Sequence, residues 1–180
     1  MKLVTIQHKK VLDILMNNKI YTSELDYIFN KVEIDESSVM NAYQFLMQQY
    51  GFKKAPIFCN KIGIKSTFNG TKSSSKIILE LNVPDNLIKI HSYNLWMHLL
   101  YAYCAYKVSN EFIDRMHDLF ADDFVAKIPI ATTFQAVIPY IHPDWLVSAY
   151  KMPNDFISKF SSSDILLADK YKNAKLIYGY

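Results

Sequence analysis

Glycine and cysteine are both scarce in this chain of 180 residues. Its four glycines are too few and too far apart for a phosphate-binding loop or a dinucleotide fingerprint, which excludes kinase, NTPase and Rossmann chemistry. The two cysteines, Cys59 and Cys104, cannot build a disulfide framework or a cysteine-type zinc site. Both lie in apolar runs, so we interpret them as buried thiols in a reducing compartment.

Arginine is almost absent. Arg115 is the only arginine among 20 Lys and Arg residues, and the formal net charge is +3. Because arginine is the preferred bidentate reader of guanine edges and phosphates, we do not expect sequence-specific DNA binding. The lysines are scattered, although the stretch 53–76 is richer in them and could form a weak phosphate-facing patch.

Long apolar runs are also missing. The N-terminal segment regains charge at His8, Lys9 and Lys10, and it lacks the apolar core of a signal peptide. The stretch that comes closest to a membrane span, 95–106, ends at Lys107 and falls short of the roughly 18 residues that a span needs. We therefore expect a cytoplasmic protein with no membrane partner.

The histidines show no metal-binding pattern. None of the five is paired with another at the i, i+4 spacing of zinc-binding helices. On a single helix, His91 and His98 would lie about 10 Å apart, at 1.5 Å per residue, and one ion cannot join them. With no glycine-rich loop either, we expect no metal and no bound redox cofactor.

The chain does contain enough apolar residues for a core. Hydrophobic residues make up 51% of the sequence and aromatic residues 14%, which argues against disorder. Periodicity and serine caps predict a single α+β domain with a mixed or antiparallel sheet and packed helices. The predicted strands are Leu3–Gln7, Pro56–Cys59, Lys76–Val83, Leu87–Ile90, Thr132–Ile138 and Leu146–Tyr150, and the main predicted helices are Ser38–Tyr50 and Ser92–Tyr106.

Two finer features of the fold are also predicted. The turn at Pro84 predicts that Lys76–Val83 and Leu87–Ile90 pair as a hairpin. The apolar faces of the strands and of the helix at 92–106 predict which side chains form the core. The predicted core residues are Leu81, Trp96, Leu99, Leu100 and Phe134.

Four short segments carry a resemblance to a known family. They are KLVTIQ at 2–7, IILELNVPD at 77–85, LWMHLL at 95–100 and FQAVIPYIHPDWLV at 134–147. Together they resemble a family of small bacterial and phage proteins, the domain-of-unknown-function family numbered thirty-eight forty-one. The resemblance covers residues 1–150 and implies one compact fold without assigning any chemistry. Residues 151–180 lie beyond it, and we expect them to form a C-terminal extension packed on the same domain.

The order of the segments also resembles small ADP-ribosyltransferase folds. In DNA-modifying toxins of that class, a Gln-Ala-Glu stretch on a late strand carries the catalytic glutamate. Here Gln135 and Ala136 are followed by Val137, so the carboxylate is absent. The likeness implies that Gln135 would line an NAD pocket with Gln7 and Tyr21 as companion contacts. The alternative is that Gln135 is simply the outward residue of an alternating strand.

The remaining hypothesis is a small soluble binding or regulatory protein. Small chains without a catalytic constellation are often phage or mobile-element products that block a host factor. The expected partner is then a host or cellular protein in a defence or nucleic-acid-processing complex. An aromatic-rich surface would suit such contacts. Complete burial would weaken this hypothesis for the following tyrosines: Tyr43, Tyr50, Tyr101, Tyr103 and Tyr106.

Overall fold

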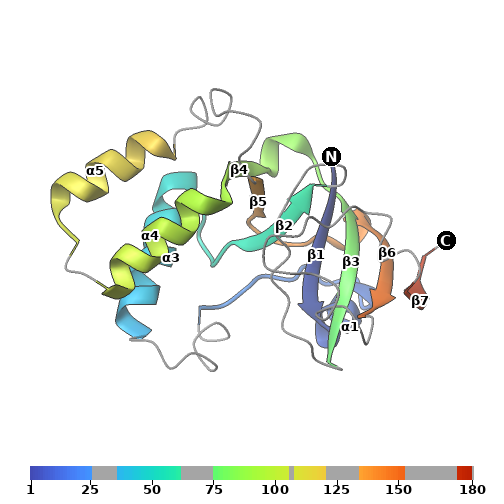
Figure 1. Ribbon diagram of the computed structural model, residues 1–180. Coiled ribbons are helices and arrows are strands. Elements are labelled where there is room, and N and C mark those ends of the chain that lie inside the picture. The colour runs from blue at the N-terminus through green and yellow to red at the C-terminus, as the bar shows by residue number, and fades with distance from the viewer. Residues whose placement is uncertain (26–35, 62–74, 106–107, 121–133, 153–173, 180) are drawn as a thin grey trace.

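The computed structural model describes residues 1–25, 36–61, 75–105, 108–120, 134–152 and 174–179. These residues form a seven-stranded antiparallel sheet of order β4-β5-β2-β1-β3-β6-β7 with helices packed against it (Figure 1). The strands are β1 Lys2–His8, β2 Ile57–Lys61, β3 Lys76–Asn82, β4 Lys89–Ser92, β5 Phe134–Ile138, β6 Leu146–Lys151 and β7 Leu176–Tyr178, and the helices are α1 Lys9–Met16, α3 Glu36–Tyr50, α4 Tyr93–Ala105 and α5 Asn110–Leu119. The predicted single-domain α+β class is confirmed, and the sheet is antiparallel rather than mixed.

The predicted hairpin between the third and fourth strands is wrong. β3 pairs with β1 on one edge and with β6 on the other, so no edge is left for β4, which pairs with β5 instead. The end of β3 is held by Met1, whose backbone exchanges hydrogen bonds of 2.9 and 2.6 Å with Val83. Beyond Val83 the chain makes a 3-10 turn at Asp85–Leu87, and β4 begins only at Lys89.

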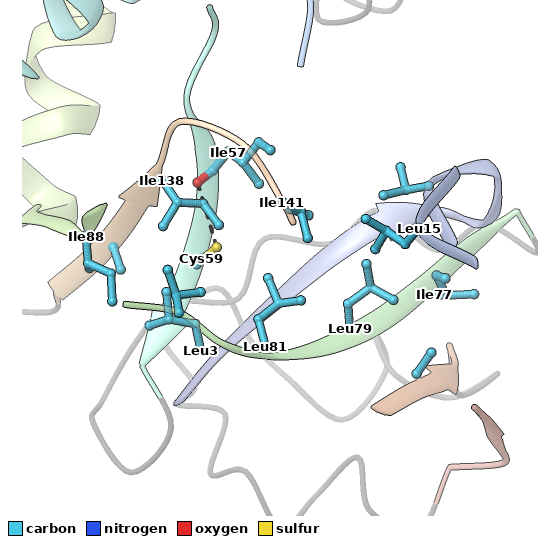
Figure 2. Packing of buried hydrophobic residues seen from close by; sticks show 14 residues of the cluster. Leu3, Leu15, Ile57, Cys59, Ile77, Leu79, Leu81, Ile88, Ile138 and Ile141 are labelled. Carbon is cyan, nitrogen blue, oxygen red and sulfur yellow. Dashed lines mark hydrogen bonds between the residues drawn. The ribbon is translucent and has the colours of Figure 1, made fainter. Parts of the chain in front are cut away.

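One face of the sheet is apolar and is covered by α1. Val11 and Leu15 of α1 pack on strand side chains in one buried cluster. Figure 2 shows these side chains pointing toward one another, with Cys59 Sγ donating a hydrogen bond to the Ile57 carbonyl oxygen at 3.7 Å. The buried strand members are Leu3, Ile57, Cys59, Ile77, Leu79, Leu81, Ala136, Ile138 and Ala149. These strands bury alternate residues on this side, as strands of an antiparallel sheet with one face on a core do.

The opposite face of β2 and its neighbours is covered by α3 and α4 (Figure 1). Phe58 lies between two residues of the first cluster, so its side chain points to this other face. There Phe58 contacts Tyr43 of α3 and Trp96 of α4, with ring centroids 5.8 and 5.5 Å away. Phe120, at the end of α5, packs against Phe45 of α3 with centroids 5.7 Å apart. The three helices and β2 therefore share one aromatic core.

The helix ends follow local signals in the sequence. Ser92 Oγ accepts a hydrogen bond from Leu95 N at 3.3 Å, and Ser109 Oγ accepts one from Phe112 N at 3.2 Å. Both serines therefore cap the start of a helix, and the cap at Ser92 agrees with the predicted start of the helix at 92–106. At the other end of α3, Gly51 has φ +67° and the chain forms the two backbone hydrogen bonds of a Schellman motif. This left-handed residue turns the chain from α3 toward β2.

The predicted core is confirmed in part. Leu81 and Leu99 are fully buried, and Trp96 is 5% exposed. Leu100 and Phe134 are only partly buried. Leu100 lies about 100° further round α4 than Leu99, which moves it off the buried stripe. Phe134 is the first residue of β5, and the two residues before it that the predicted strand included lie outside the described ranges.

β7 extends the sheet beyond β6. Tyr178 pairs with Ala149, and Leu176 pairs with Tyr150. Gly179 follows with φ +95°, and a Cβ at this position would lie 2.4 Å from the carbonyl oxygen of Val147. Only glycine therefore fits where the chain leaves β7.

Candidate functional site

Gln7 belongs to the face of the sheet that α1 covers. Its side-chain Nε2 donates a hydrogen bond to Thr5 Oγ1 at 2.8 Å, and Thr5 Oγ1 donates one to the Phe58 carbonyl oxygen at 2.8 Å. Gln7, Thr5 and Leu3 are alternate residues of β1, so they share the face on which Leu3 joins the apolar cluster. The Gln7 amide is thus engaged within its own strand.

Gln135 lies on the opposite face. The next residue, Ala136, joins the apolar cluster, and Gln135 stands directly opposite His91 of β4. In addition, β2 separates β1 from β5 in the sheet (Figure 1). The structure therefore places Gln7 and Gln135 on different faces of non-adjacent strands. The shared nucleotide pocket that the transferase likeness implies does not form between them.

Tyr21 lies on the same side of the sheet as Gln7. Its backbone exchanges hydrogen bonds of 2.9 and 2.8 Å with Ile141, and its ring packs against the apolar cluster. This cluster is on the face away from Gln135. The three predicted site residues are therefore not brought together.

His91 is fully buried beneath α3 and α4. The Tyr50 hydroxyl shares a hydrogen bond with His91 Nδ1 at 3.3 Å, and the two rings stack with centroids 6.0 Å apart and planes at 12°. Burial lowers the pKa of His91 to about 4, and the neighbouring Gln135 side chain partly opposes this shift. His91 is therefore neutral at physiological pH and orients Tyr50 as a hydrogen-bonding partner.

A row of polar side chains runs from His91 across the sheet. The register that pairs Cys59 with Ala136 also sets Asn60 opposite Gln135, which in turn faces His91. Within the described residues, Asn60 Oδ1, His91 Nε2 and Gln135 Oε1 are buried without a hydrogen-bond partner at proper geometry. A buried polar atom in this state costs about 1–3 kcal/mol. The contact between Gln135 and His91 is thus too loose to satisfy either atom.

A cavity of about 440 Å³ lies at one end of the sheet. Antiparallel register brings the start of β2, the end of β5 and the start of β4 together there, because Ile57 pairs with Ile138 and Lys89 pairs with Val137. The cavity is lined by residues 50–54 after α3, by the turn before β4 and by the residues that follow β5. None of the three predicted site residues lines it.

This cavity, which we call the lysine pocket, is defined by Lys53, Lys54 and Lys89, and none of its described lining residues is acidic. Lys54 Nζ donates hydrogen bonds of 2.9 Å to both carboxylate oxygens of Glu24, so its charge is balanced at the rim. The C-terminal end of α3 carries a partial charge of about −0.5, which offsets another part of the positive charge. Lys53 and Lys89 add two further cationic side chains to the lining, so its composition favours an anionic ligand.

Three aromatic residues line the lysine pocket, and two of them, Tyr50 and Tyr140, are held by neighbouring rings. Tyr140 stacks on Trp145 with centroids 5.0 Å apart and planes at 24°. The backbone of the next residue, Ile141, is fixed by its hydrogen bonds across an isolated bridge. The Tyr50 ring is held by its stacking contact and its hydrogen bond with His91. Both rings are therefore positioned before a ligand arrives, which lowers the entropic cost of binding a planar group.

The two cysteines differ in their surroundings. Cys59 is buried, and burial raises the pKa of its thiol to about 12, so it stays protonated and inert. Cys104 is only partly buried on α4. The interpretation of both residues as buried thiols therefore holds for Cys59 alone.

The two histidines considered as a pair, His91 and His98, lie on different elements. His91 lies on β4, whereas His98 is exposed on α4, so the two do not share a helix. No three side chains of His, Cys, Asp or Glu in the described ranges are grouped closely enough to hold a metal ion. Among the helices of those ranges, none has the length and apolar character needed to cross a membrane.

Only one wall of the lysine pocket could be predicted from the sequence. The Lys-rich stretch 53–76 predicts a phosphate-facing patch, and its first two residues, Lys53 and Lys54, do line the pocket. Residues 62–74 of that stretch lie outside the described ranges. Lys89 and Tyr140 carry no such signal, because each is an isolated residue. Lys89 opens β4 and Tyr140 follows β5, and the sheet order brings both to the cavity that Lys53 lines.

Comparison with known proteins addresses the family of the chain. Residues 2–119 match the family model described as Domain of unknown function (DUF3841). No match is found among curated proteins or solved structures. The matched segment is shorter than the range 1–150 that the four sequence segments suggest, and it stops before β5. Because it still spans more than half of the chain, the protein belongs to the DUF3841 family.

Proposed function

We propose that this chain is a binding protein that holds an anionic group of its ligand in the lysine pocket. The observation that carries the proposal is the gathering of Lys53, Lys54 and Lys89 from separate segments into one cavity whose described lining has no acidic residue. The cavity volume of about 440 Å³ falls in the range of roughly 300–1,000 Å³ that is common for small-molecule sites.

The strength of such binding is bounded by electrostatics. Two unit charges 4 Å apart attract by about 1 kcal/mol in water and by about 4 kcal/mol at an effective dielectric of about 20. Lys53 is exposed and Lys89 is partly buried, so the attraction lies toward the lower end of this range. We therefore expect modest affinity for a bare anion, and we expect it to fall as salt is added.

Charge reversal in the pocket tests the proposal directly. Lys53→Glu and Lys89→Glu should each weaken the binding of inorganic pyrophosphate by about tenfold, because each replaces an attraction by a repulsion. Isothermal titration calorimetry at low ionic strength measures the affinity. Lys10→Glu is the matched control, since Lys10 is an exposed lysine of α1 outside the pocket.

The control variant should bind pyrophosphate as the unchanged protein does. Equal affinities in the pocket variants and in Lys10→Glu would contradict the proposal, because the anion would then be held by overall charge. Failure of the unchanged protein to bind pyrophosphate at low salt would also contradict it.

A second candidate function, contact with a protein partner, is favoured by the surface of α4. Met97 is 41% exposed and Tyr101 is 61% exposed, and their i, i+4 spacing puts them on one face of the helix. The other tyrosines of interest are not fully buried either: Tyr43, Tyr50 and Tyr103 are partly buried, and Tyr106 lies outside the described residues. The proposed partner is a host or cellular protein, including one of a defence or nucleic-acid-processing complex.

Surface variants of α4 test the protein-partner proposal. Met97→Ser and Tyr101→Ser should each lower the recovery of the partner in affinity purification several-fold, because aromatic and Met anchors dominate many interfaces. Quantitative mass spectrometry of the recovered proteins measures the change. Ile20→Ser is the control, since Ile20 is 51% exposed but lies outside α4. Equal loss with Ile20→Ser, or no loss with either α4 variant, would argue against this surface.

The transferase alternative lacks the geometry that it requires. It needs Gln7 and Gln135 to converge on one bound nucleotide, and the two side chains lie on opposite faces of the sheet. A carboxylate introduced by Gln135→Glu would stand beside His91 beneath the helices. We therefore do not propose ribosyl transfer for this site.

A further inference from the structure

We infer that the ligand of the lysine pocket is a nucleoside phosphate, with its base stacked on Tyr140 and its phosphate between Lys53 and Lys89. This inference rests on the proposed function, because it assumes that the pocket takes an anion. Beyond the proposed function, the inference states that the anionic ligand also carries a planar ring. The same chemistry is offered by a free nucleotide and by the phosphorylated end of a nucleic-acid strand.

The place for a base is the wall formed by Tyr140. One face of this ring is covered by Trp145, at a centroid distance of 5.0 Å and a planar angle of 24°. Because Tyr140 also lines the lysine pocket, the part of the ring that meets a ligand is the opposite face or the edge. A base that stacks there would extend an aromatic pair that already exists, and base–aromatic stacking tolerates any base.

The place for the phosphate is set by the lysines. Lys54 is engaged by Glu24 through two contacts of 2.9 Å, so it contributes least to an incoming anion. Lys53 lies in the segment that follows α3, and Lys89 opens β4, so the two approach the pocket from different walls. Lysine suits this task because its ammonium acts as a point charge that needs no bidentate geometry.

Neutral polar groups complete the lining. Thr22 and Asn86 line the same cavity. A threonine hydroxyl can donate and accept a hydrogen bond, and an asparagine side chain offers an oxygen acceptor and an amide donor. Such groups match the hydroxyls of a ribose and the edge of a base, whereas a bare inorganic anion would use only the lysines. The mixture of cations, ring and neutral polar groups is the reason for choosing a nucleoside phosphate.

Affinity measurements on the full chain separate this inference from the proposed function. The probes are inorganic pyrophosphate, nucleosides, nucleoside monophosphates of each base and a short single-stranded oligonucleotide with a terminal phosphate. We expect a monophosphate to bind about tenfold more tightly than the matching nucleoside or pyrophosphate, since stacking and charge then act together. We expect little difference between bases.

Variants of Tyr140 test the stacking. Tyr140→Leu should reduce monophosphate affinity about tenfold, to the level of pyrophosphate, and leave pyrophosphate binding unchanged. Tyr140→Phe keeps the ring and should keep the affinity. Tyr178→Leu is the control, since Tyr178 is 36% exposed on β7 and does not line the pocket. Folding of each variant is checked by its thermal transition.

The outcomes distinguish the two levels of the proposal. If pyrophosphate binds and monophosphates bind no more tightly, the inference is overturned and the anion site stands. If neither pyrophosphate nor any monophosphate binds, the inference and the proposed function are both overturned. Monophosphate binding that is unchanged in Tyr140→Leu overturns the stacking and with it the inference. A tighter complex with the oligonucleotide than with the monophosphate supports the inference and assigns the ligand to a strand end, and equal affinity supports it and assigns a free nucleotide.

Discussion

Replacing Trp96 by alanine should lower the free energy of unfolding by about 3–5 kcal/mol, which is the usual cost of removing a buried aromatic side chain. Trp96 is 5% exposed and lies between Tyr43 of α3, at a centroid distance of 5.3 Å, and Phe58 of β2, at 5.5 Å. It therefore joins α3 and α4 to the sheet. Urea unfolding at equilibrium measures the loss, which is a large part of the roughly 5–15 kcal/mol that holds most domains folded.

The control lies on the same helix. Tyr101 is 61% exposed, so Tyr101→Ala should change the stability by less than about 0.5 kcal/mol. A loss below about 1 kcal/mol for Trp96→Ala would show that this side chain does not pack between the helices and β2. A comparable loss for both variants would show that the loss does not come from the aromatic core, since alanine favours the helix at either position.

Local pattern accounts for how well the strands could be predicted. In Lys76–Val83, alternate residues Ile77, Leu79 and Leu81 face one cluster, and the structure buries all three. Alternation is a property of the strand itself, since neighbouring side chains point to opposite faces whatever the partner strand is. The serine caps of α4 and α5 are local in the same sense, because the capping hydroxyl reaches a backbone N–H three residues away.

Strand pairing could not be predicted in the same way. The turn at Pro84 favours a hairpin between β3 and β4, but this ignores competition for the edges of β3. β1 takes one edge and β6 takes the other, through partners as far away in sequence as Leu3 and Leu146. Which strand pairs with a given edge depends on packing between residues far apart in sequence. A short sequence window does not contain this information.

The candidate site also depends on long-range contacts that local sequence patterns do not predict. Alternation predicts that Gln7 and Gln135 lie on strands, and both do, but the face that each side chain takes depends on sheet order and on which alternate residues meet the core. In a strand, a shift of one residue exchanges the two faces, so a polar residue cannot be assigned to a cleft from its strand alone. The lysine pocket combines segments near residues 22, 50–54, 86–89 and 139–140, and only the first lysines of the 53–76 stretch stood out in the sequence.

His91 should make the protein lose stability in mild acid. Burial lowers the pKa of His91 from 6.5 to about 4, so the unfolded chain takes up a proton on this ring at a pH where the folded chain does not. The stabilising contribution is complete above pH 6.5 and is lost as the pH falls toward about 4. At 1.36 kcal/mol per pKa unit, its full size is about 3 kcal/mol. Equilibrium unfolding at a series of pH values from neutral to acid measures it.

The pH dependence can be assigned to His91 by substitution. His91→Gln keeps a polar side chain against Tyr50 but removes the titrating ring, so its stability should fall less steeply between pH 6.5 and about 4 than that of the unchanged protein. Carboxylates that titrate in the same range are common to both proteins and drop out of the comparison. His98→Gln is the control, because His98 is exposed on α4 and should leave the profile as it is. Identical profiles for His91→Gln and the unchanged protein would mean that His91 reaches water in the folded state, which contradicts its burial beneath α3 and α4.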